Sequence, residues 1–343
     1  MATWTWRTVR LPLVKPLRVG GQDLAERVVL ILRRDPKDGG NPSFGEVSPL
    51  PGLHDESLDE VIAALPGAIA MLDPVLAGRM RPSSLITDVG RDPRWGDLPP
   101  SLRSGMEQVA VWALADRLRQ TDPAAVLAEA MGVSPGDAPP TAILIDDDGD
   151  LTEARGAACV KVKVGRRDRD DDISLLRTLR SRLGESGDQV EIRLDANRAF
   201  TLGEAVALAE ALPDLRPAFI EEPVFDPTDL PGFMMLTGWP VALDETLFEP
   251  AHTLLVRTLP ATAWVIKPAR CGIRGTLEMF AAARSHPDRP SCIVSSSFEG
   301  SQGMGMLDSL AACAPGLPAP GLGTAHWFGM PRPGEWKTIH GAG

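Results

Sequence analysis

The chain has 343 residues, of which 43% are hydrophobic and 24% charged, an ordinary composition for a globular protein that is long enough for two domains. Its formal net charge of -11 argues against binding to nucleic acid or docking on an anionic membrane, because both need a basic surface. The expected partner is therefore a small molecule, and an acidic one can still bind where a metal ion and lysines reverse the local sign of charge.

The cysteines and the first residues give expectations about location. Cys159, Cys271, Cys292 and Cys313 form no Cys-x-x-Cys pair, so zinc-ribbon and thioredoxin interpretations have no support. Neither a secretory signal nor an uninterrupted run of 18 apolar residues is present. We expect a cytoplasmic protein with reduced thiols, as a monomer or a small homo-oligomer.

The first part of the chain predicts a mixture of strands and helices. Hydrophobic spacing and turn residues predict short strands and loops over 3–14, strands over 26–33 and 44–47, a helix over 58–72, a loop or linker over 82–100 and a helix over 101–118.

After about residue 140, short apolar runs alternate with helical segments. The runs cover 142–145, 159–164, 191–194, 218–220, 241–243, 264–266 and 292–294, and helices are expected between them, for example over 172–183, 202–212 and 275–285. Such alternation predicts a parallel sheet, and seven or eight units favour a closed β/α barrel over a doubly wound sheet. No Gly-x-Gly-x-x-Gly follows a run, which disfavours a dinucleotide fold.

Polar residues follow each of six runs, at the point where the predicted strand ends. They are Lys161-Val162-Lys163, Asp195-Ala196-Asn197, Glu221-Glu222-Pro223, Asp244-Glu245, Lys267-Pro268 and Ser295-Ser296-Ser297. In a β/α barrel these ends meet at one mouth, which is where the active site lies.

Three carboxylates fall on consecutive strands of this predicted barrel. Asp195 and Glu221 are 26 residues apart, and Glu221 and Asp244 are 23 apart, about one β/α unit each. Side by side they would repel one another unless a cation bound there. An all-oxygen set suits Mg²⁺ or Mn²⁺, and the lack of a histidine disfavours zinc.

Lysines flank these carboxylates. Lys161 and Lys163 are two residues apart on one strand, so both side chains face inward, and Lys267 lies on the opposite side of the ring. Two adjacent ammonium groups near a metal lower each other's pKa, which makes one of them available as a base. The pattern predicts removal of a proton next to a carboxylate, with the metal stabilising the enediolate.

Other residues at the strand ends stay open to two interpretations. Glu222 and Glu245 are either part of the site or carboxylates that lie behind it or on the surface, and the run Ser295–Ser297 is either a substrate contact or a flexible loop.

Together, these residues resemble the enolase superfamily, and within it the muconate-lactonizing subgroup, which is marked by Lys-x-Lys on strand two and Lys on strand six. The resemblance covers essentially the whole chain. It implies a modified TIM barrel, (β/α)7β, over residues 96–320, an N-terminal α+β capping domain over 1–95, and a tail over 321–343 that returns to the cap.

The resemblance also implies a role for each motif residue. Lys163 would be the base and then the acid, Lys161 would tune it, and Lys267 would stabilise the enolate from the opposite face. The implied ligands of Mg²⁺, with Mn²⁺ as a possible substitute, are Asp195, Glu221 and Asp244, supported from behind by Asn197 and Glu245. The implied substrate contacts are Ser295, Ser296, Ser297 and Arg18, the last in a stretch over 16–21 that resembles a mobile lid.

Within the subgroup, the loop over 44–52 and Ser295–Gly300 most resemble the o-succinylbenzoate synthases of menaquinone biosynthesis. This resemblance implies a syn dehydration of the cyclohexadiene carboxylate SHCHC. Racemisation of N-acylamino acids and cycloisomerisation of muconate need the same lysines and stay open, as does a noncatalytic ligand-binding barrel. Dipeptide epimerases carry Asp-x-Asp after strand eight, where this chain has Gly321-Leu322-Gly323-Thr324, which counts against that activity.

Overall fold

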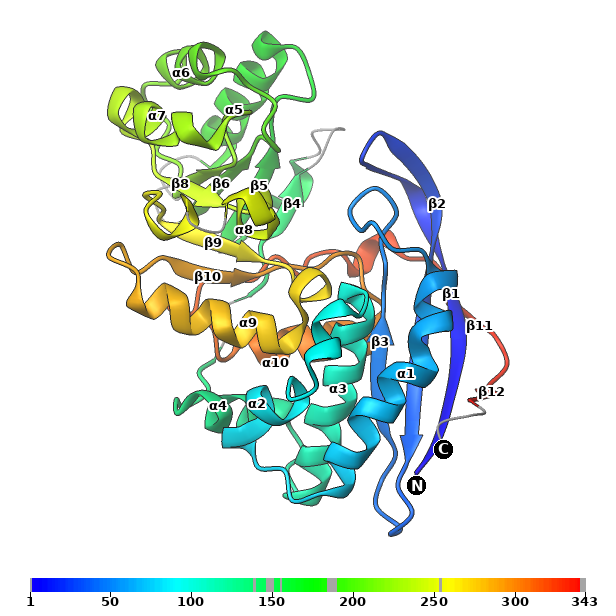
Figure 1. The fold of residues 1–343 in the computed structure, drawn as a ribbon. Helices are drawn as coiled ribbons and strands as arrows, with labels where there is room; N and C mark the ends of the chain where they lie inside the picture. Colours follow the sequence, from blue (N-terminus) through cyan, green and yellow to red (C-terminus); the bar gives the residue numbers. More distant parts are fainter. Residues whose placement is uncertain are drawn as a thin grey trace.

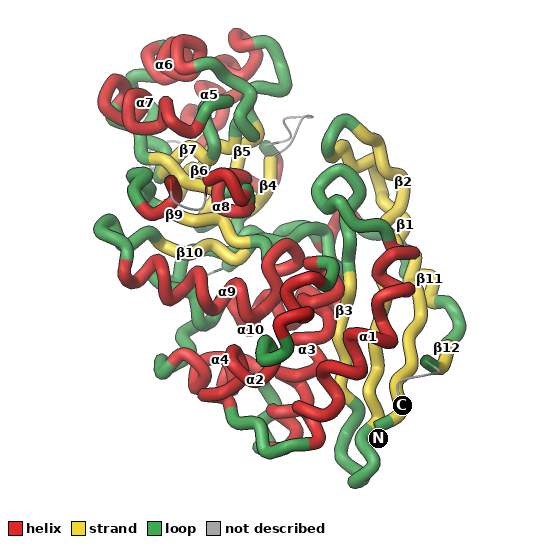
Figure 2. The backbone as a smooth tube through the Cα atoms, viewed as in Figure 1, coloured by secondary structure: helices red, strands yellow, loops and turns green. Residues whose placement is uncertain are grey.

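The computed structural model describes residues 2–137, 140–145, 151–154, 156–183, 190–252 and 255–339. Figures 1 and 2 show two parts: an antiparallel sheet with helices at its side, and a parallel sheet that curls into a barrel with helices around it.

A long hairpin forms the frame of the antiparallel sheet. Strands β1 (Thr3–Val19) and β2 (Gln22–Asp35) pair antiparallel, and β3 (Ser43–Val47) pairs with β2. The strand structure expected over 3–14 is present, but as part of one long strand, because β1 pairs with β2 on both sides of a register shift between Pro12 and Leu17. Proline has no N–H to donate, so an irregularity there is expected.

The end of the chain returns to this sheet, as predicted. The short strands β11 (Arg332–Pro333) and β12 (Lys337–Thr338) both pair antiparallel with β1. These five strands and four helices make up the part that we call the cap: α1 (Leu58–Ala77), α2 (Leu85–Val89), α3 (Pro100–Arg117) and α4 (Pro123–Met131). The cap therefore extends beyond the boundary expected at residue 95, because α3 packs on β3.

Helix α1 (Leu58–Ala77) shows why this sequence forms a helix here. Ser57 accepts a hydrogen bond from the Glu60 amide while the Glu60 side chain accepts one from the Ser57 amide, a capping box. Its buried positions include Val61, Leu65, Ile69 and Leu72, and it packs against α3. By length and apolar composition alone α1 could cross a membrane, a property that it shares with many core helices of globular proteins.

The interpretation of 82–100 as a loop or linker was wrong. This stretch holds helix α2 (Leu85–Val89) and two 3-10 turns, Pro82–Ser84 and Pro93–Asp97. Leu85, Val89 and Trp95 are buried in the main hydrophobic core. The prolines that suggested a linker stand at helix starts, where a missing N–H costs nothing. Helices α3 (Pro100–Arg117) and α4 (Pro123–Met131) follow.

The seven apolar runs form the seven strands of the parallel sheet, in the order β10-β9-β8-β7-β6-β5-β4. Their bounds are β4 (Ile143–Ile145), β5 (Cys159–Lys163), β6 (Glu191–Asp195), β7 (Phe219–Glu221), β8 (Val241–Leu243), β9 (Ala263–Ile266) and β10 (Ser291–Val294). The helices between and after them are α5 (Arg169–Leu183), α6 (Leu202–Glu210), α7 (Leu230–Thr237), α8 (Glu245–Phe248), α9 (Pro268–Ser285) and α10 (Ser301–Ala311).

A segment near residue 320 closes the ring between the first and last of these strands. Gly321 forms a parallel bridge with Ser295, and its amide donates to the Val294 carbonyl at 2.9 Å. On the other side, the Ala142 amide donates to the Pro320 carbonyl, also at 2.9 Å. The predicted (β/α)7β barrel is therefore confirmed, and the boundary expected at residue 320 falls inside the closing segment.

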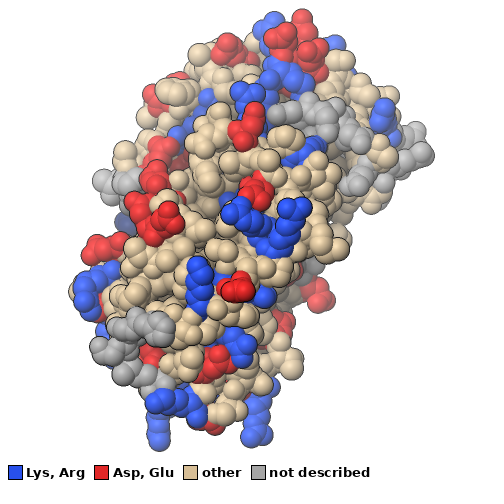
Figure 3. All heavy atoms as spheres, turned by 90° about the vertical axis from the view of Figure 1, so that its right-hand side faces the viewer, with Lys and Arg blue, Asp and Glu red and all other residues tan. Residues whose placement is uncertain are grey.

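The cap lies against one side of the barrel. Helix α3 packs on both β3 and α9, and α10 also contacts β3, so α9 and α10 lie between the barrel strands and the cap. On the face drawn in Figure 3, basic and acidic side chains of the described residues are interspersed, so this face carries mixed charge rather than an extended basic surface.

Candidate active site

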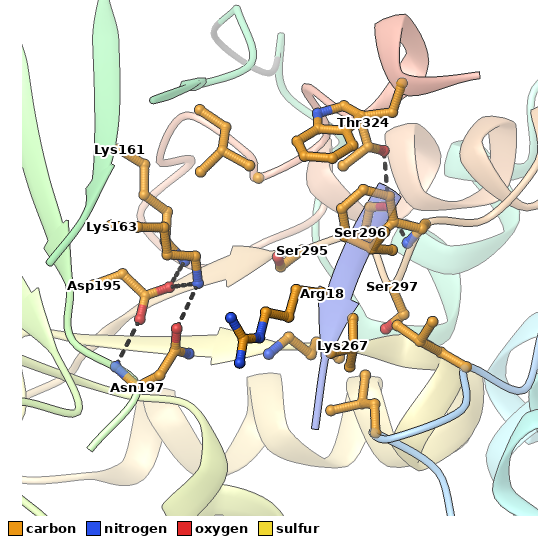
Figure 4. A pocket seen from close by; sticks show the side chains of 18 of the residues that line it. Arg18, Lys161, Lys163, Asp195, Asn197, Lys267, Ser295, Ser296, Ser297 and Thr324 are labelled. Atoms are coloured by element: carbon orange, nitrogen blue, oxygen red, sulfur yellow. Dashed lines mark hydrogen bonds and ion pairs between the residues drawn. The ribbon is translucent and has the colours of Figure 1, made fainter. Parts of the chain in front are cut away.

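A cavity of about 450 Å³ lies between the strand ends of the barrel and the loops of the cap. The ends of β5, β6, β9 and β10 supply its polar wall. The cap and the barrel share the apolar wall, through Leu17, Val19, Leu50 and Leu53 on one side and Leu144, Phe298 and Trp327 on the other. Figure 4 shows Lys161 and Lys163 entering from one side and Lys267 from the other, with Arg18 reaching in from β1. The predicted convergence of the strand ends is thus what the structure shows.

The two lysines of β5 contact different sets of acceptors. The Lys163 ammonium donates to Asp195 Oδ2 at 2.5 Å and to Asn197 Oδ1 at 2.9 Å. The Lys161 ammonium lies 2.7 Å from Asp195 Oδ2 and 2.6 Å from Glu221 Oε2, so it bridges two carboxylates.

This difference separates the pKa values of the two lysines. Burial lowers the pKa of Lys163, and nearby Lys161 and Arg166 lower it further against the pull of Asp195. Burial also acts on Lys161, but Asp195 and Glu221 together outweigh it and raise the pKa of that group. Lys161 thus lowers the pKa of Lys163, as expected of adjacent ammonium groups, whereas two carboxylates neutralise Lys161 itself.

Lys267 stands at the end of β9, and its ammonium is ion-paired with Asp244 Oδ2. Burial lowers the pKa of Lys267, but Asp244 and Glu245 outweigh burial and raise it. Lys267 is therefore set as a charged donor that faces Lys163 across the cavity.

The three predicted metal ligands are buried neighbours. Burial, followed by charge repulsion from Asp195 and then from Asp244, raises the pKa of Glu221 well above its usual range. For Asp195 and Asp244, burial also raises the pKa, but the adjacent lysines outweigh it and lower the pKa of both. Three carboxyl groups are thus held apart from water at adjoining positions.

These carboxylates fit a hard divalent cation by their chemistry. Glu221 Oε1 and Asp244 Oδ1 are buried and have no hydrogen-bond partner among the described residues, so two oxygen ligands remain available there. The side chains are turned toward lysines, and no three His, Cys, Asp or Glu side chains of the described chain form a ready-made metal cluster. A cation would therefore have to share these oxygens with the ammonium groups or displace them.

Glu222 is internal rather than exposed on the surface. Its Oε1 accepts from the amides of Asp244 and Thr246, both at 2.8 Å, and its Oε2 accepts from Arg198 Nε at 3.2 Å. The Glu222 side chain thereby holds the end of β8, the point from which Asp244 projects. Its role is to place a neighbour, and it does not line the cavity.

Asn197 and Glu245 connect the two sides of the site. Asn197 Oδ1 accepts from Lys163, and its Nδ2 donates to Glu245 Oε1 at 3.1 Å. Burial, followed by repulsion from Asp244, raises the pKa of Glu245 to about 7. Both side chains line the cavity, and the Asn197 backbone has a positive φ of 45°.

The three serines after β10 differ in how they are engaged. Ser296 Oγ contacts Thr324 Oγ1 at 3.0 Å and accepts from the Phe298 amide at 2.9 Å. Ser297 Oγ has no partner among the described residues, although its amide donates to Glu299. All three serines line the cavity, and the Ser297 hydroxyl is buried there.

The predicted lid residue Arg18 lies near the tip of the β1–β2 hairpin and lines the cavity. Sequence reasoning missed Arg166 and Trp327, which line it as well. Arg166 lies three residues after Lys163 and donates to Asn197 Oδ1 at 3.2 Å, so its place after a strand end was a usable signal. Trp327 stacks edge-to-face on Phe298, with ring centroids 5.5 Å apart, and nothing in its local sequence indicated this.

Comparison with known proteins agrees with this geometry. Residues 148–328 match the family described as Enolase C-terminal domain-like. An o-succinylbenzoate synthase of Salmonella arizonae is 30% identical over 303 residues, covering 88% of this chain and 84% of the relative.

Solved structures share the fold. A muconate lactonizing enzyme from Pseudomonas fluorescens, complexed with muconolactone, matches with a TM-score of 0.74 at 20% identity, over 95% of this chain and 88% of that one. A dipeptide epimerase from Cytophaga hutchinsonii, complexed with Mg and a dipeptide, matches with a TM-score of 0.72 at 18% identity, over 93% and 86%. Since the family match alone spans more than half of the 343 residues, the chain belongs to the enolase C-terminal domain-like family of the enolase superfamily.

Proposed function

We propose that this enzyme is a lyase that catalyses the Mg²⁺-dependent syn dehydration of SHCHC to o-succinylbenzoate, a step of menaquinone biosynthesis. Relatives about 30% identical carry the name of this activity. The observation that carries the proposal is the opposed pair of lysines in one cavity, of which Lys163 has a lowered pKa and Lys267 a raised one.

The chemistry needs one group that first accepts and then returns a proton. Neutral Lys163 takes the proton next to the ring carboxylate, and the ammonium so formed gives a proton to the departing hydroxide, which leaves as water. Because one side chain serves both steps, proton and hydroxide leave from the same face, which is a syn elimination. Lys267, as a fixed positive charge on the opposite face, stabilises the negative charge that develops on the substrate.

Asp195, Glu221 and Asp244 are the residues that would hold Mg²⁺. When bound, the ion would neutralise the charge that develops on the substrate carboxylate as its α proton is removed. Glu222 supports this set because it holds the backbone from which Asp244 projects.

The product carries two carboxylates, one on the ring and one on the succinyl chain, and the cavity offers cations for both. Arg18 and Arg166 line it in addition to the lysines, and the serines Ser295, Ser296 and Ser297 line it as well. Guanidinium groups suit carboxylates because they donate in a bidentate fork.

Racemisation of N-acylamino acids is the second candidate, because it uses the same two lysines. A racemase must use both lysines as bases in turn, and Lys163 and Lys267 face each other across the cavity as that reaction also requires. The dehydration is placed first because relatives about 30% identical carry the name of that activity. We also propose a cytoplasmic location, since the four cysteines are free thiols.

The test is the ultraviolet assay of SHCHC loss by the purified protein, with Mg²⁺ and then with EDTA. Fast turnover that EDTA abolishes supports the proposal. A folded protein that binds Mg²⁺ but leaves SHCHC unchanged contradicts it, and the same preparation should then be offered N-succinylamino acids, with racemisation followed by optical rotation.

A further inference from the structure

The segment Ser48–His54, called here the rim loop, connects β3 to α1 and lies over the cavity. Leu50, Gly52 and Leu53 of this loop line the cavity wall. None of them takes part in the chemistry proposed above, yet each limits the space that a substrate can occupy. What holds the rim loop in place therefore bears on how tightly a substrate is bound.

Glu46, at the end of β3, ties one end of the rim loop to the barrel. Its Oε1 accepts from the Gly300 amide at 2.6 Å and from Ser48 Oγ at 2.5 Å, and its Oε2 accepts from the Gly303 amide at 2.9 Å. The side chain is buried, with 2% of its surface exposed. Gly300 is the N-cap residue of α10 and Gly303 lies in its first turn, where unpaired amides and the helix dipole favour a carboxylate.

The two glycines are needed for this approach. A Cβ on Gly300 would lie 3.1 Å from Glu46 Oε2, and one on Gly303 would lie 3.2 Å from Glu46 Cδ, both tighter than ordinary contacts. The contact joins residues more than 250 positions apart in the chain. It also lies next to the serine run of the cavity, because Gly300 is only three residues after Ser297.

His54 ties the other end of the rim loop to the barrel. Its Nδ1 accepts from the Leu50 amide at 3.1 Å, so its Nε2 carries the proton and donates to the Ala269 carbonyl, also at 3.1 Å. Ala269 is two residues after Lys267, at the start of α9. The rim loop is thus attached beside two strand ends, at β10 through Glu46 and at β9 through His54.

The rim loop in turn supports the hairpin that carries Arg18. Gly52 and Gly20 meet backbone to backbone: a Cβ on Gly20 would lie 2.5 Å from the Gly52 carbonyl oxygen, and one on Gly52 would lie 2.5 Å from the Val19 carbonyl oxygen. Both glycines have positive φ, 54° and 83°. A shift of the rim loop would therefore displace the tip of the β1–β2 hairpin.

We propose that Glu46 and His54 are positioning residues that clamp the rim loop onto the barrel, so that the apolar wall of the cavity and Arg18 are already in place when the substrate binds. As far as it concerns the substrate, this inference rests on the proposed function. A preorganised wall lowers the entropic cost of binding, so loss of the clamp should raise KM more than it lowers kcat.

The test compares Glu46→Ala, Glu46→Gln and His54→Ala with the control Glu107→Gln. Glu107 is also a buried carboxylate of the cap, on α3, and it also contacts a barrel helix. It accepts hydrogen bonds from Trp95 Nε1 and from the Arg274 amide of α9, both at 2.9 Å, but it does not line the cavity. We expect Glu46→Ala and His54→Ala to raise KM for SHCHC about tenfold, with kcat within about threefold. Glu46→Gln, which keeps one accepting oxygen, should raise KM less, and Glu107→Gln should leave it unchanged.

Amide hydrogen exchange of residues 48–54 gives a readout that needs no substrate. Exchange there should be about tenfold faster in the Glu46 and His54 alanine variants and unchanged in Glu107→Gln. If Glu46→Ala folds and its exchange and KM are unchanged, the clamp is overturned. If Glu46→Ala does not fold, unchanged exchange and KM in both His54→Ala and Glu46→Gln overturn it. If the wild-type protein does not turn over SHCHC, the proposed function fails, and exchange alone decides on the clamp.

Discussion

Two groups of buried carboxylates in this protein have opposite surroundings. In the seam between cap and barrel, the carboxylate oxygens of Glu46 and Glu107 accept hydrogen bonds from backbone amides and from an indole or hydroxyl. At the strand ends, Asp195, Glu221 and Asp244 face lysine ammonium groups, and Glu221 and Asp244 each retain an oxygen without a partner among the described residues.

The difference indicates what each group is for. A buried carboxylate that is met by neutral donors fastens two elements together, because loss of the donors or the acceptor leaves a buried group unpaired. Several carboxylates and lysines buried in one place gain little stability, since desolvation offsets their attraction. Such clusters instead separate the pKa values of neighbouring groups, as seen between Lys161 and Lys163.

The largest expected effect is on the strand-end side of this comparison. Replacement of Lys163 by alanine should reduce kcat for SHCHC by roughly 10²–10⁴-fold or more, because the proton acceptor is lost. Steady-state kinetics measure the loss, and circular dichroism should show an unchanged fold. A fully active Lys163→Ala protein would remove this lysine from the mechanism.

A reciprocal pair of variants sharpens the comparison. Glu221→Gln should weaken Mg²⁺ binding, measured by titration calorimetry, by at least about tenfold. It should lower the stability of the metal-free protein little, because Lys161 keeps its ion pair with Asp195. Glu46→Gln should leave the affinity for Mg²⁺ unchanged and lower the free energy of unfolding by about 1–3 kcal/mol. If the two variants changed Mg²⁺ affinity and stability in the same way, the two groups of carboxylates would not differ in role.

The stability of the fold should depend on pH through Glu299, which lies beside Glu46 in the seam. Burial, followed by repulsion from Glu46, raises the pKa of Glu299 to about 7 from 4.5. The folded protein therefore keeps a proton that the unfolded chain releases. As pH rises from about 4.5 to about 7, the free energy of unfolding should fall by up to about 3 kcal/mol, and above that pH this contribution should stay constant. Denaturant unfolding of Glu299→Gln across this range should show a flatter profile than the wild type, and parallel profiles would refute the assignment.

The smallest effect is expected at an exposed carboxylate. Glu278 pairs with Arg274 Nε at 2.9 Å on the surface of α9, with half of the Glu278 side chain exposed. Glu278→Gln should change the free energy of unfolding by less than about 0.5 kcal/mol, because solvent screens the pair. Thermal unfolding provides the measurement, and a loss as large as that of Glu46→Gln would mean that burial does not explain the comparison.

Local patterns in the sequence predicted much of the fold. The seven strands of the barrel were found because each is a short apolar run between helical segments, and a parallel strand buried on both faces needs such a run. The stretch over 82–100 was misjudged because Pro, Gly and Asp favour loops locally, whereas burial of Trp95 against the core overrides that preference.

By itself, the sequence determined which chemical groups meet at the mouth of the barrel, because strand order and the period of two place Lys161, Lys163, Asp195, Glu221, Asp244 and Lys267 at one edge. Only the tertiary structure decided how they differ. Lys161 has a raised pKa and Lys163 a lowered one because both contact Asp195, but only Lys161 contacts a second carboxylate, that of Glu221. The contact of Glu46 with α10 could not be predicted from the sequence either, because it joins two segments more than 250 residues apart. It depends on how cap and barrel pack, which no local spacing encodes.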